Sequence, residues 1–301
     1  MRASRRSSPR TSNQRNPSAS GSSTAIDAAG PARRHRREHS ALRAFLTACA
    51  ADMRCAFRQP GTDMLTKYNT VLRRLRQHPV TITDPETGAP TEVRYQDAIG
   101  RFRTALEDAA NSPALARLLQ DLYDAPETTA PATRAAQPAA APPVDYNAPL
   151  RGGAVLCADS VNPTNPRLWS GFAHRADRAA PGFGSLFTYL SLPCATWPGT
   201  DADRYTGPWN RGTAEPVLLI GNSQGDPDTP YAGARRTAAL LGDGRLLTLD
   251  SFGHGARGKS RCVDGALDRY FIALRPPAAG TVCQPDSAPF DGRPAAHRQG
   301  R

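Results

Sequence analysis

The sequence lacks a long hydrophobic run. A membrane-spanning helix needs about 20 consecutive apolar residues, and no stretch of the 301 residues approaches that length. The arginine-rich N-terminus is also not followed by the apolar stretch of roughly 7–15 residues that marks a secretory signal. For the chain as written we therefore predict no membrane span, no signal peptide and a cytoplasmic location.

Aromatic residues are scarce, at 7% of the chain, and the net charge of +11 is unevenly distributed. Residues 1–40 hold nine arginines against Asp27 and Glu38, so this segment alone carries +7. It is rich in Ser and Pro and has neither apolar periodicity nor aromatic residues between the basic ones. These features predict a disordered tail over 1–40, and not a specific nucleic-acid-binding arm. We also predict a disordered tail over 286–301.

The sequence has no C-x-x-C motif and no cluster of His with Cys, which argues against a zinc site. We predict no metal and no cofactor. The six cysteines are an even number, and they allow about 15 disulfide connectivities, which spacing alone does not resolve. Disulfides persist in oxidising compartments, so cysteine usage suggests export and conflicts with the missing export signal.

The first half of the chain predicts helices. Residues 62–79 have an apolar stripe at helical spacing, and Pro79 ends it. Further helices are expected over 41–57, 95–109 and 113–124, with two short strands within 80–95. These elements form a helical region over 41–124, and the Pro/Ala-rich stretch 125–149 predicts an extended linker.

The second half, 150–285, predicts an α/β structure. The apolar strands "PVLLI" and "RLLTLD" alternate with helices over 231–241 and 262–274, the pattern of a parallel sheet covered by helices. "FGSLFTYLSL" predicts a buried helix and "AVLCAD" a short strand or turn. The last helix is expected to place Val263, Leu267, Tyr270, Phe271 and Leu274 on one side. Two convincing strands are too few to form a stable sheet by themselves.

Residues 221–225, "GNSQG", match the G-x-S-x-G pattern of the nucleophile elbow. An elbow serine begins a helix at once, but Pro227 and Pro230 follow Ser223 closely and disfavour one. We therefore expect Gly221 and Gly225 to let the backbone turn sharply after the strand, and Ser223 to form hydrogen bonds within that turn. A complete serine hydrolase that uses Ser223 remains the alternative.

Asp226 and His254 follow successive predicted strands. Functional groups of open parallel sheets lie at the carboxyl ends of the strands, so these two side chains are expected to be neighbours. An acid followed by a histidine matches the chain order of α/β-hydrolases, in which the acid orients the imidazole and the imidazole accepts the nucleophile's proton.

Several stretches together resemble one family: "DPDTPYAGARR", "LLTLDSFGHG", "CVDGALDRYF" with "PPAAGTVC", "AVLCADSVNP" with "CATWP", and, nearer the N-terminus, "FLTACAADMRC" and "SPALARLLQDLYDA". They are similar to secreted tripeptidyl-aminopeptidase-like serine hydrolases of actinobacteria over roughly residues 41–285. The resemblance implies a partial α/β-hydrolase fold, made of a helical lid and the last strands and helices of the parallel sheet.

The same resemblance implies site residues and partners. Asp226 would be the acid and His254 the base, and the cysteines would pair as Cys49–Cys55, Cys157–Cys194 and Cys262–Cys283. Intact relatives would be extracellular serine peptidases that release short N-terminal peptides.

The segment with the nucleophile has no counterpart in this sequence, and residues 1–40 resemble nothing in the family. We therefore expect a truncated or mis-started gene product that is inactive as written. A non-catalytic interaction protein with a basic tail is the alternative outside enzymes.

Overall fold

The computed structural model describes residues 35–291, apart from 86, 127–152, 156, 159, 200–202, 204, 206 and 211. Most of the predicted N-terminal tail, nearly all of the predicted linker and the last ten residues of the chain therefore lie outside the described residues. In the described part, no helix is both long and apolar enough to span a membrane.

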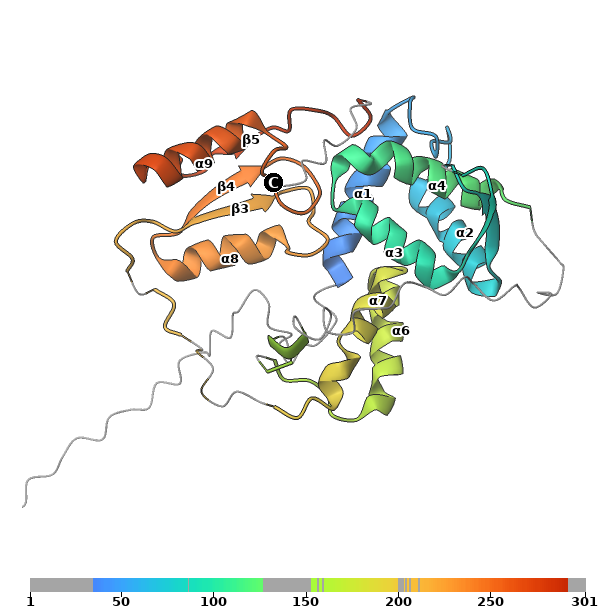
Figure 1. The fold of residues 1–301 in the computed structure, drawn as a ribbon, viewed down its shortest axis with the longest axis horizontal. Helices are drawn as coiled ribbons and strands as arrows, with labels where there is room; N and C mark the ends of the chain where they lie inside the picture. The colour runs from blue at the N-terminus through green and yellow to red at the C-terminus, as the bar shows by residue number, and fades with distance from the viewer. Residues whose placement is uncertain are drawn as a thin grey trace, which may run out of the picture.

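Four helices and a hairpin form the helical layer (Figure 1). They are α1 (His35–Ala51), α2 (Met64–Gln77), α3 (Tyr95–Leu106), α4 (Ser112–Asp124), β1 (Val80–Thr83) and β2 (Pro90–Val93). Helix α2 begins where Asp63 accepts a hydrogen bond from the amide of Thr66 and ends before Pro79. Its predicted stripe is buried except for Leu65, which is half-buried. Helix α1 begins at His35, earlier than the predicted boundary after residue 40.

A second helical pair packs against this layer: α6 (Trp169–Ala179) and α7 (Phe183–Leu190). The two helices approach closely because Gly184 has no side chain: a Cβ there would lie 2.2 Å from the carbonyl carbon of Ala176. Phe183 is fully buried in the core of the helical layer. "AVLCAD" differs from the prediction, because residues 153–155 and 157–158 are helical.

The parallel sheet has the strand order β3-β4-β5, with α8 and α9 on opposite sides of it (Figure 1). The elements are β3 (Leu218–Asn222), α8 (Tyr231–Leu241), β4 (Arg245–Leu249), α9 (Arg261–Ala273) and β5 (Val282–Cys283). β3, β4 and both helices agree with the sequence-based expectation, whereas β5, which is two residues long, was not predicted. The molecule is therefore an α/β structure.

Helix α9 departs from its predicted stripe. Val263 and Ala266 are buried, but Phe271 is 74% and Leu274 is 52% exposed. The apolar cluster beneath the helix comprises Leu247, Leu249, Ala256, Val263, Ala266 and Cys283. This cluster reaches only the first half of α9, so Phe271 and Ile272 of the second half face solvent.

Three disulfides cross-link segments of the chain that lie close in sequence. The structure contains Cys49–Cys55, Cys157–Cys194 and Cys262–Cys283, with Cα–Cα distances of 5.2, 4.9 and 5.7 Å. These are the pairings that the family resemblance implied.

The packed structure continues past the predicted boundary at residue 285. Phe290 is buried in the core of the helical layer, where its ring lies 6.3 Å from that of Phe45. Residues 286–291 therefore belong to the fold, contrary to the predicted C-terminal tail over 286–301.

Candidate active site

The two loops at the carboxyl ends of β3 and β4 meet directly. Because the strands are parallel, both loops emerge at the same edge of the sheet. Gly225 bridges to Phe252, and the amide of Gly253 donates to the carbonyl of Gly225 over 2.8 Å. The loops are thus paired by their backbones before any side chain is considered.

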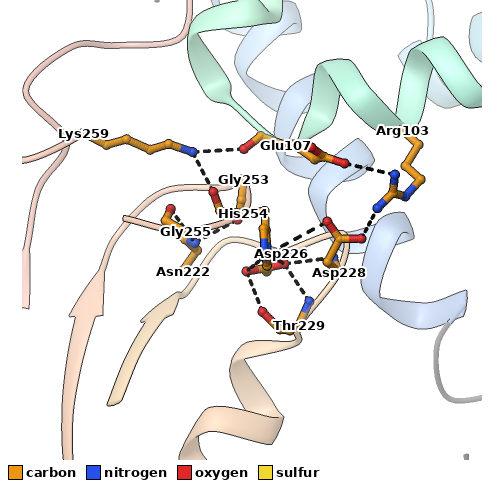
Figure 2. A network of polar contacts seen from close by, with 10 residues as sticks. All are labelled: Arg103, Glu107, Asn222, Asp226, Asp228, Thr229, Gly253, His254, Gly255 and Lys259. Atoms are coloured by element: carbon orange, nitrogen blue, oxygen red, sulfur yellow. Dashed lines mark hydrogen bonds and ion pairs between the residues drawn. The ribbon is translucent and has the colours of Figure 1, made fainter. Parts of the chain in front are cut away.

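Asp226 and His254 are in contact at this junction (Figure 2). Nδ1 of His254 lies 3.1 Å from Oδ1 and 3.3 Å from Oδ2 of Asp226. The carboxylate is 4% exposed, and it also accepts hydrogen bonds from the amides of Asp228 and Thr229 and from the Thr229 hydroxyl. These donors compensate the charge for its burial.

The geometry defines the imidazole tautomer. A carboxylate is an acceptor, so Nδ1 of His254 carries the proton and donates a hydrogen bond to Asp226. The neutral ring then has its lone pair on Nε2. In the described part of the chain Nε2 makes no hydrogen bond, and the side chain is 45% exposed. The arrangement therefore presents an oriented base to solvent.

Asn222, Glu107 and Lys259 hold the backbone around His254 (Figure 2). Nδ2 of the buried Asn222 donates to the carbonyls of Gly253 and Gly255, over 2.8 and 3.2 Å. The amide of His254 donates to the carbonyl of Glu107 over 2.7 Å. Nζ of Lys259 donates to the carbonyls of Glu107 and His254, each over 2.9 Å. The histidine is thus fixed on both sides by β3 and by the helical layer.

Lys259 is the cation nearest the backbone of His254. Burial lowers the pKa of its ammonium, while the charges of Asp108 and Asp226 act in the opposite direction. Its Nζ lies 3.7 Å from Oδ2 of Asp108. Through its two hydrogen bonds, the partly buried ammonium of Lys259 connects the histidine loop to the end of α3.

A second carboxylate lies near the imidazole. Oδ2 of Asp228 is 3.9 Å from Nδ1 of His254. Asp228 is ion-paired with Arg103 of α3, whose guanidinium also lies 3.0 Å from Oε1 of Glu107. The helical layer therefore supplies charged groups to the site as well as backbone contacts.

Ser223 points to a different partner. Its hydroxyl donates to Oδ1 of Asp250 over 2.7 Å, and this bond, with a further one from Gln224, lowers the pKa of Asp250. The expected hydrogen bond within the turn is thus a bond across to the end of β4. The next helix, α8, begins at Tyr231, so Ser223 is not at the start of a helix as an elbow serine would be.

The two glycines of "GNSQG" have separate roles. Gly225 has a φ of 144°, and a Cβ there would lie 2.5 Å from the amide nitrogen of Ala41. Gly221 lies within β3, where a Cβ would come 2.7 Å from the ring of Tyr231. Gly225 therefore permits the turn, as expected, and it also permits the approach of α1. Gly221, which was expected to serve the turn as well, instead provides room for an aromatic ring.

Known proteins match the second half of the chain. Residues 180–283 match the family described as TAP-like protein. A tripeptidyl aminopeptidase of Streptomyces lividans is 32% identical over 138 residues, which cover 45% of this chain and 25% of that protein. The corresponding protein of Streptomyces coelicolor is 31% identical over the same length. Carboxylesterase B of Mycobacterium tuberculosis is 30% identical over 138 residues, or 26% of its length.

Residues 180–283 are thus similar to this family, and we refer to them as the TAP-like region. The match spans about a quarter of the length of these curated relatives. Asp226, His254, Asn222 and Lys259 lie within the TAP-like region, whereas Arg103 lies outside residues 180–283. The site is therefore built by the TAP-like region together with the helical layer.

Among the residues that the structure describes, no group of three His, Cys, Asp or Glu side chains is arranged to hold a metal ion. The chemistry that the site offers is that of an oriented imidazole beside a buried carboxylate.

Proposed function

We propose that this chain carries the acid and the base of a serine-hydrolase triad, with Asp226 as the acid and His254 as the base. The observation that carries the proposal is the contact between the buried carboxylate and Nδ1, which leaves Nε2 facing outward. In this role Nε2 accepts the proton of the nucleophilic hydroxyl and later donates it to the leaving group. Asp226 holds the tautomer and stabilises the imidazolium that forms between the two steps.

The proposed reaction class is hydrolysis of a carboxylic amide or ester. The printed names of the relatives include a tripeptidyl aminopeptidase and a carboxylesterase. Both reactions transfer an acyl group and use the same acid–base pair. We place a peptide first, because the two Streptomyces relatives carry the aminopeptidase name.

We further propose that residues 41–124 form a lid-like region over the carboxyl ends of the strands. Glu107 and Arg103, from the end of α3, contact the histidine loop and the acid loop, respectively. Contact between a helical layer and both loops is what a cover over an active site requires.

The nucleophile is the missing component in this proposal. The serine and its oxyanion donors would belong to a part of the fold that the described residues do not form. Apolar surface supports this placement: no residue of α8 is buried, and Leu218, Leu219 and Ile220 of β3 are half-buried. Parallel sheets are normally covered on both faces. We therefore propose that the chain as given does not form an acyl-enzyme.

Nuclear magnetic resonance of the His254 imidazole tests the acid–base assignment. We expect a Nδ1–H proton signal shifted downfield by its bond to a carboxylate, and an unprotonated Nε2. Asp226→Asn retains an oxygen for the amides of Asp228 and Thr229 but removes the carboxylate, so the downfield signal should be lost. His254→Gln assigns the signal.

Asp250→Asn is the matched control. Asp250 lies at the end of β4 and bonds to Ser223 and Gln224, so this variant should keep the His254 signal. A proton on Nε2 in the unaltered protein, or an unchanged signal in Asp226→Asn, would overturn the proposed pair.

A further inference from the structure

Two carboxylates of one loop compete for the same imidazole nitrogen. Asp226 lies 3.1 Å from Nδ1 of His254 and Asp228 lies 3.9 Å from it. The two distances differ by less than about 1 Å, so both carboxylates lie within ion-pair range of the same nitrogen. Some other feature must keep the imidazole directed at Asp226.

Part of the selection comes from the loop itself. Oδ1 of Asp226 accepts the amides of Asp228 and Thr229, over 2.8 and 2.7 Å, and its Oδ2 accepts the Thr229 hydroxyl. These bonds fix the rotamer of Asp226 from within its own turn. Asp228 receives its restraint from outside the loop.

That restraint is Arg103, which comes from helix α3 and pairs with Oδ1 of Asp228 (Figure 2). The same guanidinium bonds to Glu107 one helical turn further along, over 3.0 Å, and lies 5.9 Å from the ring centre of Phe187. The side chains of Arg103 and Asp228 are 29% and 22% exposed. A pair with this little exposure is screened less than a surface ion pair.

We propose that Arg103 is a positioning residue: by holding Asp228 in an ion pair, it leaves Asp226 as the carboxylate that orients His254. The inference rests on the proposed function, because the orientation matters only if His254 acts as a base. It extends that function to the helical layer, whose helix α3 selects the acid from a distance of 125 residues along the chain.

The remaining charged groups around His254 do not replace Arg103. Glu107 is already paired with Arg103, and its carbonyl, not its carboxylate, contacts the histidine loop. Lys259 lies 3.7 Å from Asp108 and donates to the carbonyls of Glu107 and His254. Loss of Arg103 therefore leaves Asp228 without that cation beside it, and Lys259, which donates to the carbonyl of His254, is engaged with Asp108 and Glu107.

The Nδ1–H signal of His254 reports which of the two carboxylates, Asp226 or Asp228, the imidazole contacts. Arg103→Gln should shift this signal and broaden it by faster exchange with solvent, because Asp228 becomes free to compete. Asp228→Asn by itself should leave the signal in place. The double variant, Arg103→Gln with Asp228→Asn, should restore the sharp signal, since the competing carboxylate is gone. A purely structural role for Arg103 would not be rescued in this way.

Two controls complete the design. Arg101→Gln removes an exposed arginine from the same helix and should leave the signal unchanged. Arg103→Lys keeps a cation but not the planar fork that reaches two carboxylates, so it should give an intermediate shift. This variant also serves if Arg103→Gln does not fold, and an unchanged signal in Arg103→Lys would then count against the proposal.

The outcomes separate the two claims. If Asp226→Asn abolishes the signal but Arg103→Gln leaves it unaltered, the positioning role is wrong and the acid–base pair stands. If the double variant is as perturbed as Arg103→Gln, Arg103 acts through the fold and not through Asp228, and the proposal fails. If Asp226→Asn leaves the signal intact, the proposed function itself fails.

Discussion

Replacing Asn222 by alanine should destabilise the protein and loosen His254. The side chain is 2% exposed at the end of β3, and its amide donates to the carbonyls on both sides of the histidine. Alanine removes both donors without adding bulk. The perturbation therefore acts on the backbone that holds His254, the proposed base, and leaves the imidazole itself unaltered.

The magnitude follows from the surroundings of each acceptor. The carbonyl of Gly253 is in a buried residue, so leaving it without a donor costs about 1–3 kcal/mol. Gly255 is exposed, so water can replace the amide there and the loss is about 0.5–1 kcal/mol. Asn222 Oδ1 is buried without a partner among the described residues, so its removal offsets part of this loss of stability. We expect a net loss of about 2 kcal/mol in the free energy of unfolding.

Equilibrium unfolding in urea, with the disulfides intact, measures this value. For a slope of about 2–3 kcal/mol per M, the midpoint should fall by about 0.7–1 M. Gln224→Ala is the matched control, because its exposed amide bonds to Asp250 at the surface. The control should change stability by less than about 0.5 kcal/mol.

The His254 Nδ1–H signal should also broaden in Asn222→Ala and not in Gln224→Ala. Equal stabilities of the two variants, or an unaltered histidine signal in Asn222→Ala, would refute the reasoning that Asn222 supports the base.

Two further predictions concern the ends of β4 and β5. The Ser223 hydrogen bond lowers the pKa of Asp250, so its stabilisation is complete above the unfolded value of about 3.9 and is lost as the pH falls through the folded value. In urea unfolding, Ser223→Ala should therefore lower the free energy of unfolding at pH 7. The difference from the unaltered protein should shrink below a pH of about 4. A difference in the free energy of unfolding that does not depend on pH would contradict this. Replacing Cys262 and Cys283 by alanine opens a loop with a sequence separation of 21, which should cost about 3 kcal/mol in the same assay, and a loss below about 1 kcal/mol would contradict it.

Strong periodicity made most of the fold predictable. The stripe of α2 and the alternation of β3, α8, β4 and α9 follow from local patterns that burial then reinforces. Helix α6 was missed because its buried face is only weakly apolar: of its buried residues Trp169, Ala173 and Ala176, two are alanines. β5 was missed because two residues form no pattern, and the pairing with β4 depends on the tertiary structure.

The candidate site was likewise predictable from the sequence only where local patterns determine it. Asp226 and His254 were placed together because parallel strands bring their following loops to one edge. Arg103 and Lys259 were not found, since their contacts span 125 and 152 residues and depend on how the helical layer packs. Asn222 lay within "GNSQG", but that motif directs attention to the serine, and the amide's role appears only when its two carbonyl partners are in place. The catalytic roles of Asp226 and His254 stay a prediction.

The most direct test of the central claim is labelling of the purified chain with a fluorophosphonate probe, alongside hydrolysis of aminoacyl and tripeptidyl fluorogenic substrates. If, as we propose, the chain carries the acid and the base without a nucleophile and its oxyanion donors, it should give no labelling and no enzyme-like hydrolysis. The acyl-enzyme route would then be closed, and about 3–4 kcal/mol of transition-state stabilisation would be lost. Stoichiometric labelling of Ser223 that disappears in both Ser223→Ala and His254→Ala would contradict the account and show a complete hydrolase built around "GNSQG".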